Sequence, residues 1–105
     1  MLIVYQVVVE VLRLLQPVAR AIQSHDRDLA RQLRRASTSV LLNLSEGGGT
    51  RGGARRERYL TALGSARETT ACIDAAVALG YIAYVDAELR DRLDRVRGTL
   101  VKLVR

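Results

Sequence analysis

Phenylalanine and tryptophan are absent from this chain of 105 residues, and only four tyrosines supply aromatic side chains. Apolar residues nevertheless make up 49% of the chain, and most of them are alanine, leucine and valine. An apolar fraction this high argues against disorder, and side chains of this size suit closely spaced helices. The length fits one domain, so we expect a single domain over residues 1–105.

Cysteine and histidine occur only once each, as Cys72 and His25. One cysteine cannot form an intramolecular disulfide, and two such ligands cannot complete the usual zinc site. Cys72 lies in an alanine-rich helical pattern, which favours a small buried side chain over a reactive thiol. Since no catalytic arrangement of side chains is recognisable, we expect a protein that is not an enzyme and has no metal or cofactor.

Lysine is also scarce, because 16 of the 17 basic residues are arginine, and the net charge is +6. A basic surface favours polyanions, and arginine can pair bidentately with phosphate. The apolar amino terminus has no basic region or cleavage site of a signal peptide, and Gln6, Glu10 and Arg13 interrupt it. The sequence therefore predicts a cytoplasmic protein that does not interact with membranes.

Hydrophobic periodicity predicts four helices, at about residues 2–22, 27–45, 54–79 and 86–104. In the first segment, polar residues recur every three or four positions and form one narrow stripe: Gln6, Glu10, Arg13, Gln16 and Arg20. The rest of its circumference is apolar, which is more than one neighbouring helix would cover. Pro17 is expected to kink this helix or to end its first part.

The second segment predicts an amphipathic helix that Ser24 or Asp26 can cap. One arc is apolar, and the opposite arc carries four arginines: Arg27, Arg31, Arg34 and Arg35. Leu41 and Leu42 fall on or beside the arginine side. They suggest a second contact, such as one with another subunit.

The third segment opens with a basic turn, Arg55, Arg56 and Arg58, and Gly80 is well placed to end it. Asp86 is a good cap for the fourth segment, whose apolar residues form a heptad-like seam: Leu89, Leu93, Val96, Leu100 and Leu103. Two pairs at i,i+4 are expected on its solvated faces, Glu88 with Arg92 and Asp91 with Arg95. The four segments predict an all-α, antiparallel up-down-up-down four-helix bundle.

The stretch NLSEGGGTRGG, residues 43–53, contains the dinucleotide-binding pattern G-x-G-x-x-G at Gly47, Gly49 and Gly52. That pattern requires a preceding strand, whereas the residues before it continue a helical period. We therefore interpret the stretch as a joint in which Gly47 ends the second helix and flexible residues reverse the chain. Arg51 and the arginines after it still allow a phosphate contact from this loop.

Three motifs resemble the four-helix bundle family that includes proteins encoded in 23S ribosomal-RNA intervening sequences. QLRRASTSVLLNLSEGGGTR, residues 32–51, is similar to its pattern Q-[LI]-R-R-A-x-x-S-[IV]-x-x-N-I-A-E-G-x-G-R. ALGSARE, residues 62–68, and LGYI, residues 79–82, are similar to two later motifs. The chain departs from the pattern at Leu44-Ser45 and in extra glycines, which are expected to loosen the joint: Gly48, Gly49, Gly52 and Gly53.

The resemblance assigns motif positions on the second helix to Arg34, Arg35, Asn43, Glu46 and Gly47, and on the third helix to Gly64, Ser65 and Glu68. We expect Asn43 to hydrogen-bond another helix or to cap the joint. We expect Glu46 to pair with an arginine such as Arg67 or to fix a backbone amide. A catalytic pair of Glu46 and Glu68 is disfavoured because no pocket or perturbed acid is visible.

The family's relatives include the accessory variability protein of diversity-generating retroelements, a basic pentameric barrel that binds nucleic acid and a reverse transcriptase. The resemblance implies a ring-like homo-oligomer, with a pentamer favoured, and a reverse transcriptase as a partner. We expect the oligomer to bind RNA or DNA, mostly through the backbone, at eight arginines: Arg27, Arg31, Arg34, Arg35, Arg51, Arg55, Arg56 and Arg58. The alternative is an oligomeric adaptor or scaffold that binds no nucleic acid.

Overall fold

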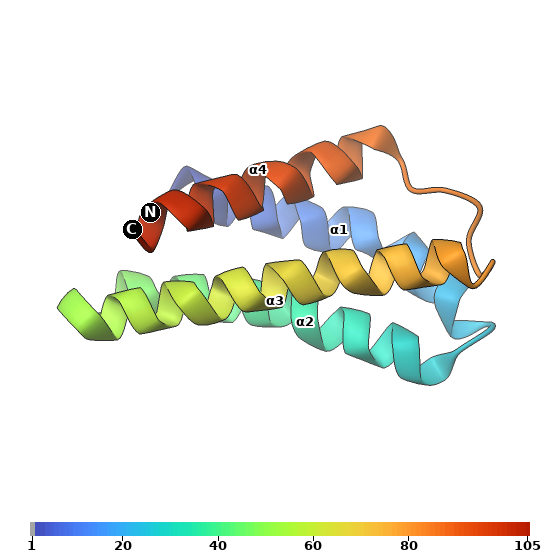
Figure 1. The fold of residues 1–105 in the computed structure, drawn as a ribbon, viewed down its shortest axis with the longest axis horizontal. Helices are drawn as coiled ribbons and strands as arrows, with labels where there is room; N and C mark the ends of the chain where they lie inside the picture. Colours follow the sequence, from blue (N-terminus) through green and yellow to red (C-terminus); the bar gives the residue numbers. More distant parts are fainter. Residues whose placement is uncertain (1) are drawn as a thin grey trace.

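The computed structural model describes residues 2–105, so Met1, the first residue of the predicted domain, lies outside the described part. Residues 2–105 form four helices: α1 (Ile3–Gln23), α2 (Arg27–Gly48), α3 (Gly52–Ala78) and α4 (Ala87–Leu103). No strand occurs within residues 2–105, which confirms the predicted all-α class with four helices. Successive helices run back and forth along the 42 Å axis, so the start of α1 lies near the end of α4 (Figure 1).

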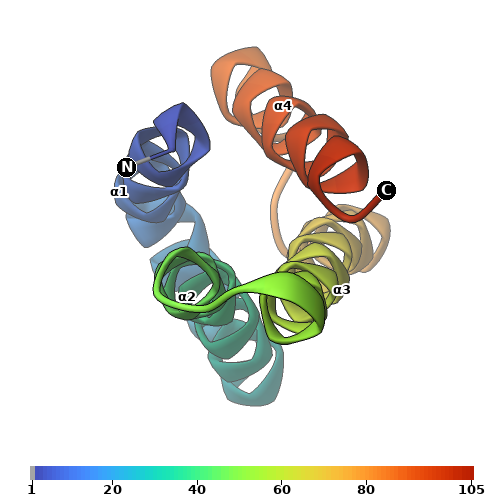
Figure 2. The same cartoon turned by 90° about the vertical axis from the view of Figure 1, so that its left-hand side faces the viewer.

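Each helix packs against two others around a common core (Figure 2). α2 lies between α1 and α3, and α4 closes the arrangement by contacting α1 and α3. The contact between α2 and α3 is the most extensive one. Small buried side chains on the two helices, such as Ala36 on α2 and Ala62 and Ala66 on α3, let their backbones approach closely.

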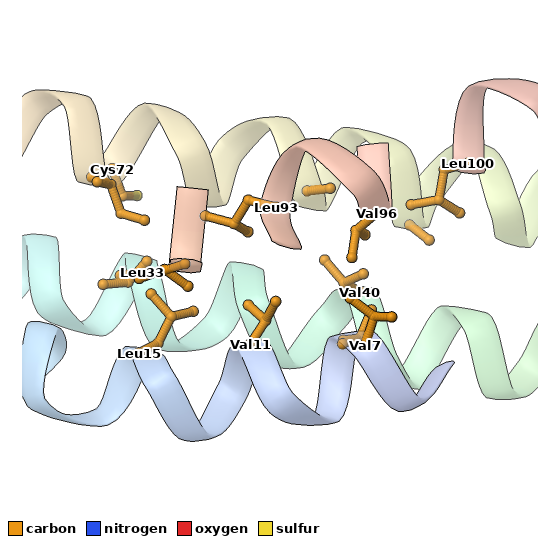
Figure 3. Close-up of a cluster of buried hydrophobic side chains, with 14 of the residues drawn as sticks. Val7, Val11, Leu15, Leu33, Val40, Cys72, Leu93, Val96 and Leu100 are labelled. Carbon is orange, nitrogen blue, oxygen red and sulfur yellow. The ribbon is translucent and has the colours of Figure 1, made fainter. Parts of the chain in front are cut away.

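The core is built mainly from aliphatic side chains of all four helices (Figure 3), and Cys72 and Tyr59 also belong to it. The predicted seam of α4 is buried at Leu89, Leu93, Val96 and Leu100, and Leu103 packs partly against it. The polar stripe of α1 is exposed as expected. Much of the surplus apolar surface of α1 is covered, because α1 contacts both α2 and α4 rather than one neighbour.

Three predicted helix ends are confirmed. The Asp26 carboxylate accepts a hydrogen bond from the Leu29 amide at 3.0 Å and caps α2. The Asp86 carboxylate accepts one from the Glu88 amide at 2.8 Å and caps α4. Gly80 has a φ of 77° just beyond α3, and the amides of Gly80 and Tyr81 donate to the carbonyls of Val77 and Ala76, which is a Schellman motif.

Of the two effects expected of Pro17, a kink or an end to the first part of the helix, the end does not occur, because α1 continues from Ile3 to Gln23 with Pro17 exposed inside it. The end predicted for the second helix is wrong. Gly47 does not end the second helix, because α2 continues to Gly48 and α3 already begins at Gly52. Only residues 49–51 connect the two helices, so the joint is short rather than loose.

Candidate nucleic-acid interface

Gly47 lies buried inside α2, where the ring of Tyr59 on α3 packs directly against it. A Cβ atom at this position would lie only 2.4 Å from Cε1 of Tyr59. The glycine is therefore needed for close contact between two helices rather than for a turn. The upstream residues Val40–Leu42 are helical as well, which confirms that the glycine pattern follows no strand and is not part of a dinucleotide fold.

The joint is held by hydrogen bonds to its own backbone. The Gly47 carbonyl accepts from the Thr50 amide at 3.2 Å, from Thr50 Oγ1 at 3.1 Å and from Arg55 Nε at 3.1 Å. Arg55 Nε also donates to the Thr50 carbonyl at 2.9 Å. The amides of Gly49 and Thr50 are used inside the joint, so they do not form an anion cradle. Gly52, with a φ of 57°, supplies the backbone conformation from which α3 starts.

Four exposed arginines surround this joint, and we call them the basic joint: Arg51, Arg55, Arg56 and Arg58. Arg55 Nε is anchored on two carbonyls, and Arg56 Nε donates to the Val104 carbonyl at 2.8 Å. All three hydrogen bonds use Nε and leave the terminal nitrogens of the two guanidinium groups available. None of the four forms an ion pair within residues 2–105.

The basic joint also coincides with the amino terminus of α3, a helix of 27 residues. Its first turn contains no acidic residue, and Arg51 at the cap position makes no side-chain capping bond. The unpaired amides of a first turn and the helix dipole both favour negative charge at this end. The local electrostatics of the joint therefore favour an anion.

The four arginines of α2 are placed differently. Arg31 forms an ion pair with Asp28 at 2.8 Å, and Arg34 donates to Gln23 Oε1 at 2.7 Å. Arg27 is exposed at the start of the helix, and Arg35 lines a hollow beside α3. Half of this predicted arginine face is thus already engaged by polar partners within the chain.

The two arginine groups do not form one continuous surface. Arg35 and Gly48 are 13 residues apart on α2, which at the rise of an α-helix corresponds to about 20 Å. In Figure 1 the start of α2 and the start of α3 lie toward opposite ends of the long axis. A ligand that touches both groups must therefore extend along the bundle.

Asn43 makes different contacts from those expected. Its Nδ2 donates to the Ser39 carbonyl at 2.9 Å and to Ser39 Oγ at 3.1 Å, both within its own helix. Ser65 Oγ on α3 donates to the same Ser39 Oγ at 2.8 Å. Asn43 thus neither caps the joint nor reaches α3 directly, and Ser39, which the sequence did not single out, connects the two helices.

The other motif residues of the two helices lie at the surface. Glu46 is exposed, and its carboxylate forms neither the expected pair with Arg67 nor any other ion pair within residues 2–105. Gly64 is exposed, and a Cβ atom placed on it would meet no other atom within 4 Å. Glu68 lines the same hollow as Arg35. Glu46 and Glu68 are 22 positions apart in the chain and do not share a hollow.

Nothing in residues 2–105 forms a group of three or more metal-ligating side chains. Burial raises the pKa of the Cys72 thiol, and the nearby Glu68 carboxylate raises it further, which keeps the thiol protonated. His25 stacks on Tyr81 with ring centroids 5.3 Å apart. Partial burial raises the pKa of Tyr81, as do the charge of Asp26 and the hydrogen bond at 3.3 Å that its carboxylate accepts.

The chain matches the model of a protein family described as 23S rRNA-intervening sequence protein over residues 1–102. The chain belongs to this family. The match agrees with the resemblance of the three sequence motifs. A search of curated proteins finds no match to the chain.

The fold is shared with a protein of known structure. A crystal structure at 1.70 Å from Bacteroides thetaiotaomicron, described as a protein with unknown function from the S23 ribosomal protein family, superposes with a TM-score of 0.83. The similarity covers 98% of this chain and 99% of that chain, with 15% sequence identity. At this identity the similarity shows the fold alone. No helix within residues 2–105 combines the length and apolar character needed to cross a membrane.

Proposed function

We propose that this member of the 23S rRNA-intervening sequence protein family forms a homo-oligomer that binds nucleic acid through the basic joint and performs no catalysis. The observation that carries the proposal is the set of four exposed arginines within eight residues, none held by an ion pair in the described chain. Their terminal nitrogens are suited to phosphate oxygens, which accept bidentate hydrogen bonds.

Two features of the joint favour phosphate binding over the alternative that these arginines are only solvated surface residues. Arg55 and Arg56 are each anchored through Nε, so less side-chain freedom is lost when their terminal nitrogens bind a ligand. The amino terminus of α3 adds partial positive charge at the same place. Arg27, which is exposed at the other end of α2, would extend the contact to a nucleic acid long enough to follow the bundle, whereas Arg31 and Arg34 are already engaged by Asp28 and Gln23.

The proposed binding is mostly independent of sequence. Two of the four tyrosines lie near the arginines of the joint, and both are packed inward. The ring of Tyr59 is buried against Gly47, and Tyr5, which lines a hollow with Arg55, is half-buried against the core. Stacking of bases on aromatic rings, a common source of affinity for single strands, is therefore not expected at this surface. Affinity then comes chiefly from phosphate contacts and the release of counterions.

The assembly that the family resemblance favours is a ring of five copies, with a reverse transcriptase as a candidate partner. Exposed apolar side chains support self-association, among them Ile3, which is 73% exposed, and Leu42, which is 58% exposed. Leu41, the neighbour of Leu42, packs partly against the core, so the predicted Leu41-Leu42 patch is reduced to Leu42.

A direct test is a binding titration of the purified protein against a structured RNA and a DNA duplex at low and at physiological salt. We expect binding of both at low salt and a loss of affinity of about 10²–10⁴-fold on going from 50 to 200 mM salt, as several phosphate contacts predict. An absence of binding at low salt would contradict the proposal and leave the oligomeric scaffold as the better hypothesis.

A further inference from the structure

A polar hollow of about 380 Å³ lies between α2 and α3 on their outer side, and we call it the α2–α3 hollow. Its lining comes from six residues, four on α2 and two on α3: Gln32, Arg35, Ala36, Ser39, Ser65 and Glu68. The 2.8 Å hydrogen bond between Ser65 and Ser39 joins the two helices at this point. The hollow is therefore shaped by fixed helices rather than by a mobile loop.

Two opposite charges line the hollow without partners. Neither Arg35 nor Glu68 forms an ion pair within residues 2–105. A phosphate backbone would satisfy Arg35 but would be repelled by Glu68. The pair of charges instead fits a protein surface that presents one acid and one base.

Gly64 adds a second observation beside the hollow. It lies inside the 27-residue helix α3, where glycine is less favourable than alanine. A Cβ atom there would meet nothing within 4 Å, in contrast to Gly47, whose Cβ would collide with Tyr59. No contact inside the chain therefore requires glycine at position 64, and the missing side chain leaves room for a backbone to approach α3 from outside.

An exposed face of α4, at the edge of the hollow that α4 forms with α1, has matching properties. Gly98 is exposed inside α4, and a Cβ atom there would also meet nothing within 4 Å. One acid and one base of this helix, Asp91 and Arg95, are exposed, and the ion pair expected between them is absent from residues 2–105. Each of the two faces thus carries an open glycine, an unpaired acid and an unpaired arginine.

We propose that α4 of a second copy of this chain docks in the α2–α3 hollow. Gly98 of that copy would pass over Gly64, Asp91 would lie toward Arg35, and Arg95 toward Glu68. The two faces differ, so the contact is head-to-tail and can repeat from copy to copy until a ring closes. The inference rests on the homo-oligomer in the proposed function and names the surfaces that build it.

Apolar side chains beside the hollow fit the same contact. Leu42 lies one helical turn from Ser39, and Leu60, which is 37% exposed, lies one turn from Gly64. Both leucines lie on the side of the hollow nearest the joint, where an apolar edge would help to exclude water from the ion pairs that form on docking.

The test uses two variants of the full chain, Gly64→Leu and Gly98→Leu, with Gly48→Leu as a control. All three glycines are exposed helical residues with no atom within 4 Å of a Cβ position, so the substitutions fit the single chain equally well. Circular dichroism checks that each variant has the helix content of the wild type and unfolds cooperatively; a lower melting temperature is expected for a variant that has lost the oligomer. Mass is measured by light scattering at micromolar concentration.

We expect Gly64→Leu and Gly98→Leu each to lower the mass from that of the oligomer to the 11.6 kDa of a single chain, and Gly48→Leu to retain the oligomer. An equimolar mixture of Gly64→Leu and Gly98→Leu chains should form dimers and nothing larger, because it contains one intact pair of docking faces.

A Gly64→Leu variant with the full oligomeric mass would overturn the inference, and so would a mixture that stays monomeric. If Gly64→Leu keeps its mass but loses affinity for RNA, nucleic acid rather than a second copy occupies the hollow, and the inference is wrong. A monomeric wild type would refute both the inference and the proposed oligomer. Oligomers that assemble normally but bind no RNA would refute only the proposed nucleic-acid binding.

Discussion

Gly47 is the residue whose role depends most on a distant partner. A Cβ atom would lie 2.4 Å from Cε1 and 2.7 Å from Cδ1 of Tyr59, so Gly47→Ala forces the ring or the helix to shift. We expect the free energy of unfolding to fall by about 1–3 kcal/mol, as for overpacking of a core. A Cβ atom at position 48 would have no neighbouring atom within 4 Å, so Gly48→Ala should change the free energy of unfolding by less than about 0.5 kcal/mol. Chemical denaturation of the two variants measures the difference, and equal effects would refute the packing explanation.

Cys72 gives a prediction about pH. Burial, and secondarily the charge of Glu68, raise the pKa of its thiol above the ordinary value of 9.0. The folded state therefore holds this proton more tightly, which contributes stability that is present below pH 9 and is lost as the pH rises through the raised pKa. We expect the wild type to lose more stability above pH 9 than Cys72→Ala does. Parallel pH dependences of the two unfolding free energies would contradict this assignment.

At the residue scale, the sequence predicted what depends on near neighbours. Asp26, Asp86 and Gly80 act on backbone groups within a few positions of themselves. Asp86 and Gly80 were assigned correctly, and Asp26 was one of two candidate caps beside Ser24. The roles of Gly47 and Asn43 were not predicted correctly. Gly47 depends on Tyr59 and Asn43 depends on Ser39, and the sequence pattern does not show these contacts.

At the element scale, Arg92 connects α4 to α1. Its Nε lies 2.6 Å from Glu10 Oε2 on α1, and its Nη1 lies 2.7 Å from Glu88 Oε1, the one expected i,i+4 pair that forms. The hydrogen bond to Glu10 is the main cause that raises the pKa of Arg92, so the side chain stays charged at any pH at which the fold is stable.

Removal of this link should weaken the packing of α4. We expect Glu10→Gln to lower the free energy of unfolding by about 0.5–1 kcal/mol at low salt and by less at high salt, since the pair is partly exposed. Asp94→Asn removes an ion pair with Arg97 inside α4 and should cost only about 0–0.5 kcal/mol. Denaturant titrations at two salt concentrations measure the free energy of unfolding of both variants. If Glu10→Gln loses no more stability than Asp94→Asn, the ion pair between α1 and α4 adds no stability beyond that of a pair within one helix.

The four helices could be predicted from hydrophobic periodicity, but the structure of the joint between α2 and α3 could not. Glycine has a low helix propensity, which led to the prediction that residues 46–53 form a loop. The structure places Gly47 and Gly48 in α2 and Gly52 and Gly53 in α3. Packing against Tyr59 and the hydrogen bonds to the Gly47 carbonyl outweigh the propensity, and such tertiary terms are not visible in a single sequence.

At the scale of the whole molecule, the net charge of +6 is unevenly distributed. Several arginines on α2 and α4 pair with neighbouring acids, whereas those of the basic joint do not. Composition alone predicted a polyanion partner but could not distinguish these groups. The position of charge, rather than its total, should therefore determine affinity for nucleic acid.

The most direct test of this claim compares two double variants by fluorescence anisotropy with a labelled structured RNA. Arg51→Gln/Arg58→Gln changes the basic joint, whereas Arg13→Gln/Arg20→Gln removes two exposed arginines from the polar stripe of α1, so that both variants lose two positive charges. We predict that the joint variant binds at least about tenfold more weakly and has a salt dependence reduced by about one to two phosphate contacts, while the α1 variant binds nearly as the wild type does. Equal losses in the two variants would contradict the account, because they would mean that total charge and not the basic joint governs binding.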